Sequence, residues 1–86
     1  MPIHEEQALL KALARRDIKA FVQLYKDYGE DLLILAYSFL EDAREAEQMV
    51  DRFFEDLWEK TDFDSIEVPL YRYLATEMRK ACGESS

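Results

Sequence analysis

An apolar stripe at helical spacing constrains the fold of this chain more than any other feature of its sequence. Between residues 46 and 60, apolar side chains recur every three or four positions, and polar or charged side chains fill the positions between them. The members of the stripe are Ala46, Met49, Val50, Phe53, Phe54, Leu57 and Trp58. This pattern predicts an amphipathic helix with a buried apolar face and a charged opposite face.

Similar periodicity predicts helices along most of the chain. We expect them over residues 5–16, 18–28, 30–40, 43–60 and 70–82, with Asp17 and Asp42 as N-caps of the second and fourth. Gly29 is expected to end the second helix. The almost wholly apolar segment 30–40 is expected to be central and packed on several sides. Residues 61–69 read as a loop that Phe63 attaches to the core.

The composition supports a single all-α domain over residues 1–86, a compact helical bundle of four to five helices. Of the 86 residues, 49% are hydrophobic, which is enough for one core. The chain contains only two glycines and two prolines. A β architecture needs many turns, in which these residues are common, so we do not expect strands.

Motifs of catalysis, cofactor binding and metal binding are absent from the sequence. The one histidine, His4, stands near the N-terminus, and the carboxylates are scattered. We therefore expect no enzymatic activity, no cofactor and no metal site. The longest apolar run, LLILAY, is too short to cross a bilayer, so no membrane role is expected. The single Cys82 excludes an intrachain disulfide and suggests a reducing, cytoplasmic compartment.

The net charge of −8 argues against strong binding to nucleic acid. A contact with DNA would have to be local, or assisted by a basic partner.

A longer pattern runs from Leu9 to Ala81. It combines a short start like "D..AF..LY..Y", a central "AE..V...F..LWE" preceded by "AYSFLED", and a final "YL....R". The matching positions are Asp17, Ala20, Phe21, Leu24, Tyr25, Tyr28, Leu33, Ala36, Leu40, Asp42, Ala46, Glu47, Val50, Phe54, Leu57, Trp58, Tyr73, Leu74 and Arg79. In this order they resemble region 2 of the extracytoplasmic-function sigma factors of bacterial RNA polymerase.

The resemblance implies a function in transcription initiation. The outer face of the 43–60 helix would dock on the clamp helices of the largest subunit of core RNA polymerase. The following loop and the last helix would recognise and help to melt the Pribnow box of promoter DNA. The implied polymerase-binding residues are Gln48, Asp51, Arg52, Glu55 and Asp56. The implied DNA-binding residues are Asp62, Phe63, Arg72, Arg79 and Lys80.

Departures from the family pattern support a second hypothesis. Gln48, Asp51 and Arg52 change the order of charges on the docking face, and the last helix lacks the basic run of the family. We expect no second, region 4-like domain. The chain would then be a stand-alone module that binds polymerase or an anti-sigma protein and has lost DNA binding. A third possibility is a helical domain that self-associates through leftover apolar surface.

Simpler interpretations apply to the same residues. An acidic helix face can be solvated without binding anything, and cations near the end of the last helix suit the helix dipole. Phe63 suits an anchor of the loop as well as a wedge between DNA bases. Trp58 is expected to lie in the core.

Overall fold

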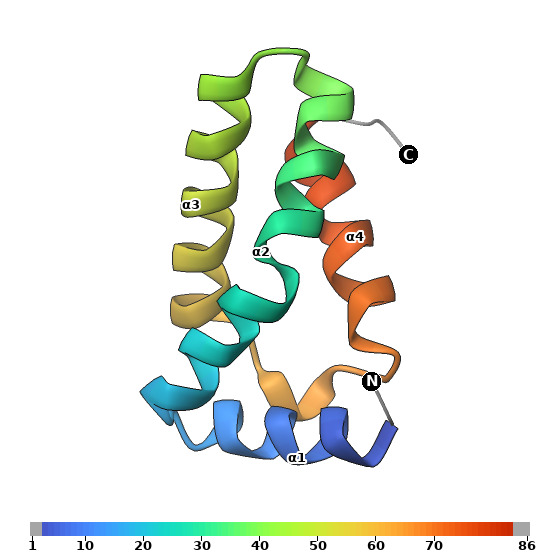
Figure 1. Ribbon diagram of the computed structural model, residues 1–86. Coiled ribbons are helices and arrows are strands. Elements are labelled where there is room, and N and C mark those ends of the chain that lie inside the picture. Colours follow the sequence, from blue (N-terminus) through green and yellow to red (C-terminus); the bar gives the residue numbers. More distant parts are fainter. Residues whose placement is uncertain (1–2, 84–86) are drawn as a thin grey trace.

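The computed structural model describes residues 3–83, and over that range its regular elements are all helices (Figure 1). Its elements are α1 (Ile3–Ala14), α2 (Ile18–Leu40), α3 (Ala43–Lys60), the short 3-10 helix η1 (Phe63–Ser65) and α4 (Leu70–Ala81). The side chain of His4 lies outside the part whose side chains are described. The prediction of an all-α bundle is confirmed.

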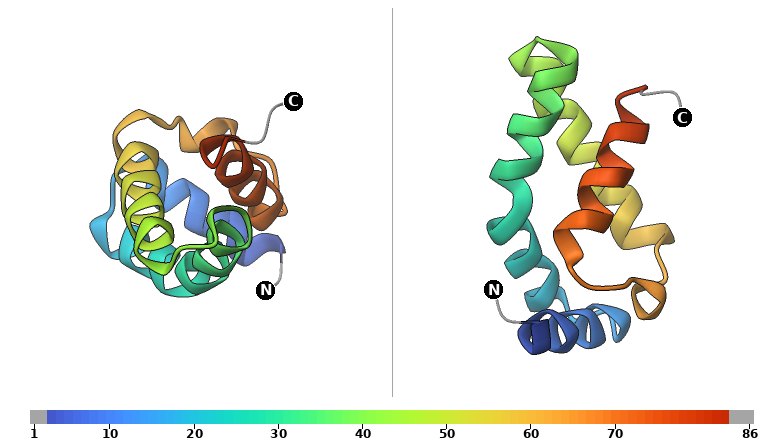
Figure 2. Two further views of the ribbon diagram at one scale, coloured as in Figure 1. Left: turned by 90° about the horizontal axis from the view of Figure 1, so that it is seen from above. Right: turned by 90° about the vertical axis from the view of Figure 1, so that its right-hand side faces the viewer.

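Three helices stand side by side and the first crosses one end of them. Seen from above, α2, α3 and α4 surround a common interior, and α1 lies beneath them (Figure 2). α2 contacts each of the other helices, and α1 also packs on η1. The chain therefore folds around α2, with α1 and the η1 loop closing the lower end.

α2 is one continuous helix of 23 residues, so the expected break at Gly29 is wrong. The helix begins after Asp17, whose side chain accepts a hydrogen bond from the Lys19 N–H at 3.0 Å. It ends only at Glu41, which adopts a left-handed conformation with φ of 55°. The buried stripe on both sides of the glycine consists of Leu24, Tyr28, Leu32 and Ala36. Burial of this stripe outweighs the cost of about 1 kcal/mol that glycine imposes inside a helix.

The second half of α2 is not packed on all sides, which corrects the prediction for residues 30–40. Leu32 and Ala36 are fully buried, but Ile34 is 61% exposed and Tyr37 is 51% exposed. α1 lies at the opposite end of the molecule, so only α3 and α4 flank this half (Figure 1). Two neighbours cover one side of a helix and leave the other side in solvent.

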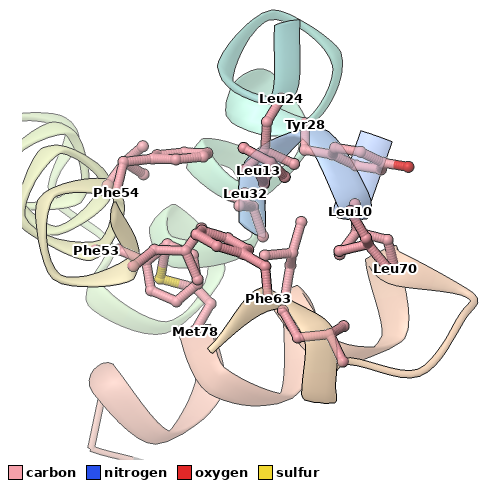
Figure 3. Close-up of a cluster of buried hydrophobic side chains, with 14 of the residues drawn as sticks. Leu10, Leu13, Leu24, Tyr28, Leu32, Phe53, Phe54, Phe63, Leu70 and Met78 are labelled. Atoms are coloured by element: carbon pink, nitrogen blue, oxygen red, sulfur yellow. The ribbon is translucent and has the colours of Figure 1, made fainter. Parts of the chain in front are cut away.

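The predicted stripe of α3 faces the core. Five of its seven members are buried, namely Ala46, Val50, Phe53, Phe54 and Leu57, and Met49 and Trp58 are partly buried at its edges. Phe53 and Phe54 point toward Leu24 and Leu32 of α2 and toward Met78 of α4 (Figure 3). Trp58 therefore lies at the margin of the core and not within it.

A buried carboxylate joins the first helix to the last. Glu6 is 5% exposed, and its Oε1 accepts a hydrogen bond from the backbone N–H of Leu70 at 2.6 Å. Leu70 begins α4, and the preceding Pro69 provides no side-chain cap. Helix N-termini have unpaired N–H groups and favour negative charge. Glu6 therefore caps α4 from a distant part of the chain.

A second long-range contact fixes the corner between α1 and α2. Arg16, with φ of 61°, donates hydrogen bonds to the carbonyl oxygen of Trp58 and, at 3.2 Å, to that of Thr61. Its guanidinium carbon also lies 5.4 Å from the Trp58 ring centroid and 5.3 Å from that of Phe63. The last carbonyl groups of a helix lack partners and attract cations, so Arg16 caps the C-terminal end of α3.

Replacement of Gly29 by alanine is expected to stabilise the protein. A Cβ at this position would meet the Tyr25 ring at 3.6 Å, an ordinary contact. Removing a helical glycine should therefore raise the free energy of unfolding by about 0.5–1 kcal/mol. Urea denaturation of Gly29→Ala beside the unmodified protein measures this, and a lowered midpoint would show that the Tyr25 ring resists the methyl group.

Loss of the Glu6 cap is expected to destabilise the protein. Glu6→Ala leaves the buried Leu70 N–H unpaired and should lower the free energy of unfolding by about 1–3 kcal/mol. Glu6→Gln keeps an acceptor oxygen and should cost less. Glu5→Ala, on the exposed side of the same turn, is the control, with an expected change within about 0.5 kcal/mol. Equal effects of the two alanine substitutions would contradict the cap.

Stability is expected to fall at alkaline pH because of Tyr28. Burial, and then the charges of Glu6, Asp27 and Asp31, raise the pKa of Tyr28 above its ordinary value of 10.0. Above pH 10.0 the unfolded chain loses this proton first, so the free energy of unfolding decreases up to the folded-state pKa. Tyr28→Phe should lessen the decrease. Denaturation curves at neutral and alkaline pH would test the difference.

Candidate protein-docking surface

The exposed face of α3 carries all five predicted polymerase-binding residues. Gln48, Asp51, Arg52, Glu55 and Asp56 are each exposed to solvent. The helix that presents them begins at Asp42, whose side chain accepts a hydrogen bond from the Glu45 N–H at 3.0 Å, as the predicted N-cap. Because the opposite face of α3 is buried, these five side chains lie on one side of the molecule.

α3 forms a ridge between two grooves, and the five residues are divided between them. Asp51 and Glu55 line the groove toward α2, whereas Arg52 and Asp56 line the groove toward α4. Gln48 lies beside Arg52 in a smaller pocket of about 190 Å³ near the top of α3. A partner that covers the ridge would contact both edges, while a partner in one groove would contact only part of the set.

The groove between α2 and α3 is acidic at its edges and aromatic in its floor. It consists of two adjoining pockets of about 380 and 360 Å³ that share Tyr25 and Asp51. Its acidic side chains are Glu30, Glu47, Asp51, Glu55 and Glu59, and its aromatic side chains are Phe21, Tyr25, Phe54 and Trp58. Among the residues that the structure describes, no lysine or arginine lines either pocket. We call this surface the acidic groove.

The rings of the acidic groove are packed in two cross-helix pairs. The centroids of Phe21 and Trp58 lie 4.7 Å apart, and those of Tyr25 and Phe54 lie 4.8 Å apart. Tyr25 is still 44% exposed. The floor of the groove is thus held rigidly by the fold, yet keeps aromatic surface in contact with solvent.

The groove between α3 and α4 has a different character. It has a volume of about 440 Å³, with apolar surface from Met49, Phe53, Leu57 and Tyr73. Its charges are nearly balanced, because Lys60 lies 3.8 Å from Asp56 and Lys80 lies 3.3 Å from Glu77. Exposed pairs of this kind contribute little to stability.

The predicted DNA-binding residues belong to two elements, η1 with its N-cap and α4. Asp62 begins η1, where its side chain accepts a hydrogen bond from the Asp64 N–H at 3.1 Å. Arg72, Arg79 and Lys80 are exposed on α4. Arg72 and Arg79 are two helical turns apart, about 10 Å along the axis.

Phe63 is in the core, which corrects its assignment to a DNA-binding surface. Its side chain is 2% exposed and points into the core (Figure 3), and η1, which carries it, packs against α1. A ring buried in this way cannot stack on a base without partial unfolding of the loop. The interpretation of Phe63 as a loop anchor is confirmed.

Several residues that shape this surface were not predicted from the sequence. Arg16 holds the lower end of α3 from 42 residues away, and no local pattern marks that contact. The four-residue spacing of Phe21, Tyr25, Gly29 and Leu33 was a usable signal for the wall of the acidic groove.

Comparisons of the chain with known protein families, with curated proteins and with solved structures found no match. In the part of the chain that the structure describes, no helix has the length and apolar character needed to cross a membrane. Within the same residues, no three His, Cys, Asp or Glu side chains are grouped so that they could hold a metal ion.

Proposed function

We propose that this chain is a non-catalytic docking domain of the sigma region 2 type, and that α3 binds core RNA polymerase. The observation that carries the proposal is the continuous exposed polar face of α3. Five side chains at the positions that the family resemblance selects lie together there. Of these five, only Asp56 forms a salt bridge within residues 3–83, an exposed pair with Lys60.

The charge of this face suits a basic partner. Asp51, Glu55 and Asp56 carry three negative charges against the single positive charge of Arg52. Complementary charge mainly speeds encounter and fixes orientation. In this proposal the clamp helices of the largest polymerase subunit supply the positive charge.

Promoter recognition forms the second part of the proposal. Arg72, Arg79 and Lys80 on α4 would contact phosphates of the Pribnow box, and Asp62 would lie at the edge of that contact. Three cations on a chain of net charge −8 cannot bind DNA tightly alone. Promoter DNA would therefore be bound only when polymerase holds the domain in place.

A second candidate function is a stand-alone module that binds polymerase or an anti-sigma protein without contacting DNA. Two observations favour it. Phe63 is buried, and Lys80 is paired with Glu77 at 3.3 Å. Of the predicted DNA-binding cations, only Arg72 and Arg79 then have no salt bridge among the described residues.

Reversal of two charges on α3 is expected to abolish polymerase binding. Asp51→Lys with Glu55→Lys changes exposed residues, so circular dichroism should show an intact fold. Purified core polymerase, and separately its largest-subunit clamp fragment, should then no longer be captured by the variant. Glu5→Lys with Glu67→Lys, which makes the same change of charge on other elements, is the control and should bind normally. Normal binding by the α3 variant would contradict the docking assignment.

A promoter assay separates the two candidate functions. If the domain contacts DNA, Arg72→Ala with Arg79→Ala should keep polymerase binding and reduce promoter opening by the polymerase complex at least tenfold. If the chain is a docking module alone, polymerase capture should persist, and neither the unmodified protein nor this variant should support opening.

A further inference from the structure

We propose that the acidic groove between α2 and α3 is a docking site for one basic amphipathic helix of a partner protein. Lysine or arginine side chains of that helix would face the acidic edges, and its apolar side chains would cover the aromatic floor. The site is defined by the groove itself and does not depend on polymerase being the partner.

The acidic edge on α3 is a regular row of like charges. Glu47, Asp51, Glu55 and Glu59 are spaced four residues apart and are all exposed. Side chains at this spacing are neighbours on a helix, and like charges there destabilise it. None of the four forms a salt bridge within residues 3–83. The four carboxylates thus repel one another along the helix without a salt-bridge partner among the described residues, and a basic partner would relieve that repulsion.

The opposite wall contributes one more acid and the exposed ring of Tyr25. Glu30 of α2 lines the same groove as Glu47 and Asp51. Cations bind favourably over aromatic faces, and the effect increases when water is displaced. The molecule already shows this chemistry at the lower end of the groove, where the Arg16 guanidinium lies 5.4 Å from the Trp58 ring centroid.

Gly29 lines the groove as a buried residue of α2, beside the Tyr25 ring. It is a helical residue in the wall between Tyr25 and Leu33, and a Cβ there would meet only ordinary contacts at 3.6 Å or more. Neither packing nor backbone conformation requires glycine at this position.

The groove favours a helix over other occupants. Both walls are helices, so they offer no free backbone edge to pair with an extended segment, whose N–H and C=O groups would face aromatic rings. A helix satisfies its own backbone groups. The wall from Phe21 to Leu33 is about 18 Å long, enough for three turns of a partner. Nucleic acid and anionic membranes are disfavoured by the five carboxylates.

A synthetic peptide tests this site without polymerase. The probe is a helical peptide of about five turns, with leucines along one face and lysine or arginine flanking them at every fourth position. The matched peptide has the same leucines but glutamate in place of each cation. Trp58 is the only tryptophan and lines the groove, so its fluorescence reports occupancy, and calorimetry measures affinity.

Two pairs of substitutions on α3 locate the binding. Glu47→Lys with Glu59→Lys reverses charge on the acidic groove and should weaken binding of the basic peptide at least tenfold. Glu45→Lys with Asp56→Lys makes the same change on the side of α3 that lines the other pockets, and it should weaken binding less than threefold. Gly29→Leu should fill the groove and also weaken binding at least tenfold, with its fold checked by circular dichroism.

Three results would overturn the proposal. The first is that the folded, unmodified protein does not bind the basic peptide. The second is that the glutamate peptide binds as tightly as the basic peptide. The third is that the two charge-reversed variants lose binding of the basic peptide to the same extent. The last result would mean general attraction of a cation to an acidic protein. If the protein bound the peptide but not polymerase, the proposed acidic groove site would stand, and only the proposal that polymerase is the partner would be contradicted.

Discussion

The contact between Arg16 and the end of α3 determines how the lower half of the molecule is arranged. One guanidinium group bonds the carbonyl groups of Trp58 and Thr61 and lies against the rings of Trp58 and Phe63. It therefore fixes the α1–α2 corner, the end of α3 and the start of the loop relative to one another. Phe21, five residues further along, then packs on Trp58 and closes the lower end of the acidic groove.

Local sequence patterns correctly predicted the features that depend only on residues close together in the chain. The stripe of α3 and the caps at Asp17 and Asp42 follow from helical spacing and from side-chain oxygens that reach nearby N–H groups. The same reasoning wrongly predicted a helix end at Gly29. The helix continues there because residues on both sides of the glycine are buried against other helices, which is a tertiary effect. Local reasoning also failed for Ile34, whose exposure depends on how few helices are present to cover it.

The candidate site was only partly accessible from sequence for a related reason. The exposed residues of α3 followed from periodicity, but their division between two grooves depends on where α2 and α4 lie. Glu6 and Leu70 are 64 residues apart, and the sequence around each gives no sign of the other. Phe63 had two sequence interpretations, and only its burial where η1 packs against α1 decided between them.

The two edges of α3 differ in electrostatic character, and this difference shapes what each can recognise. On the α4 side, Lys60 and Lys80 form salt bridges with nearby acidic side chains. On the α2 side the carboxylates stand without such partners in the described chain. A partner attracted by charge alone would therefore approach from the α2 side, and its apolar surface would then decide whether it stays.

The unpaired acidic row also makes ionic strength act in opposite directions on the free and the bound protein. In the free chain, dissolved salt screens three successive repulsions along α3, each of about 0.2–0.5 kcal/mol, and so strengthens the fold. In a complex with a basic helix, the same screening weakens the attraction that holds the partner. At low ionic strength the domain would therefore be less stable but would bind its partner more tightly. At high ionic strength it would be more stable and would bind the partner more weakly.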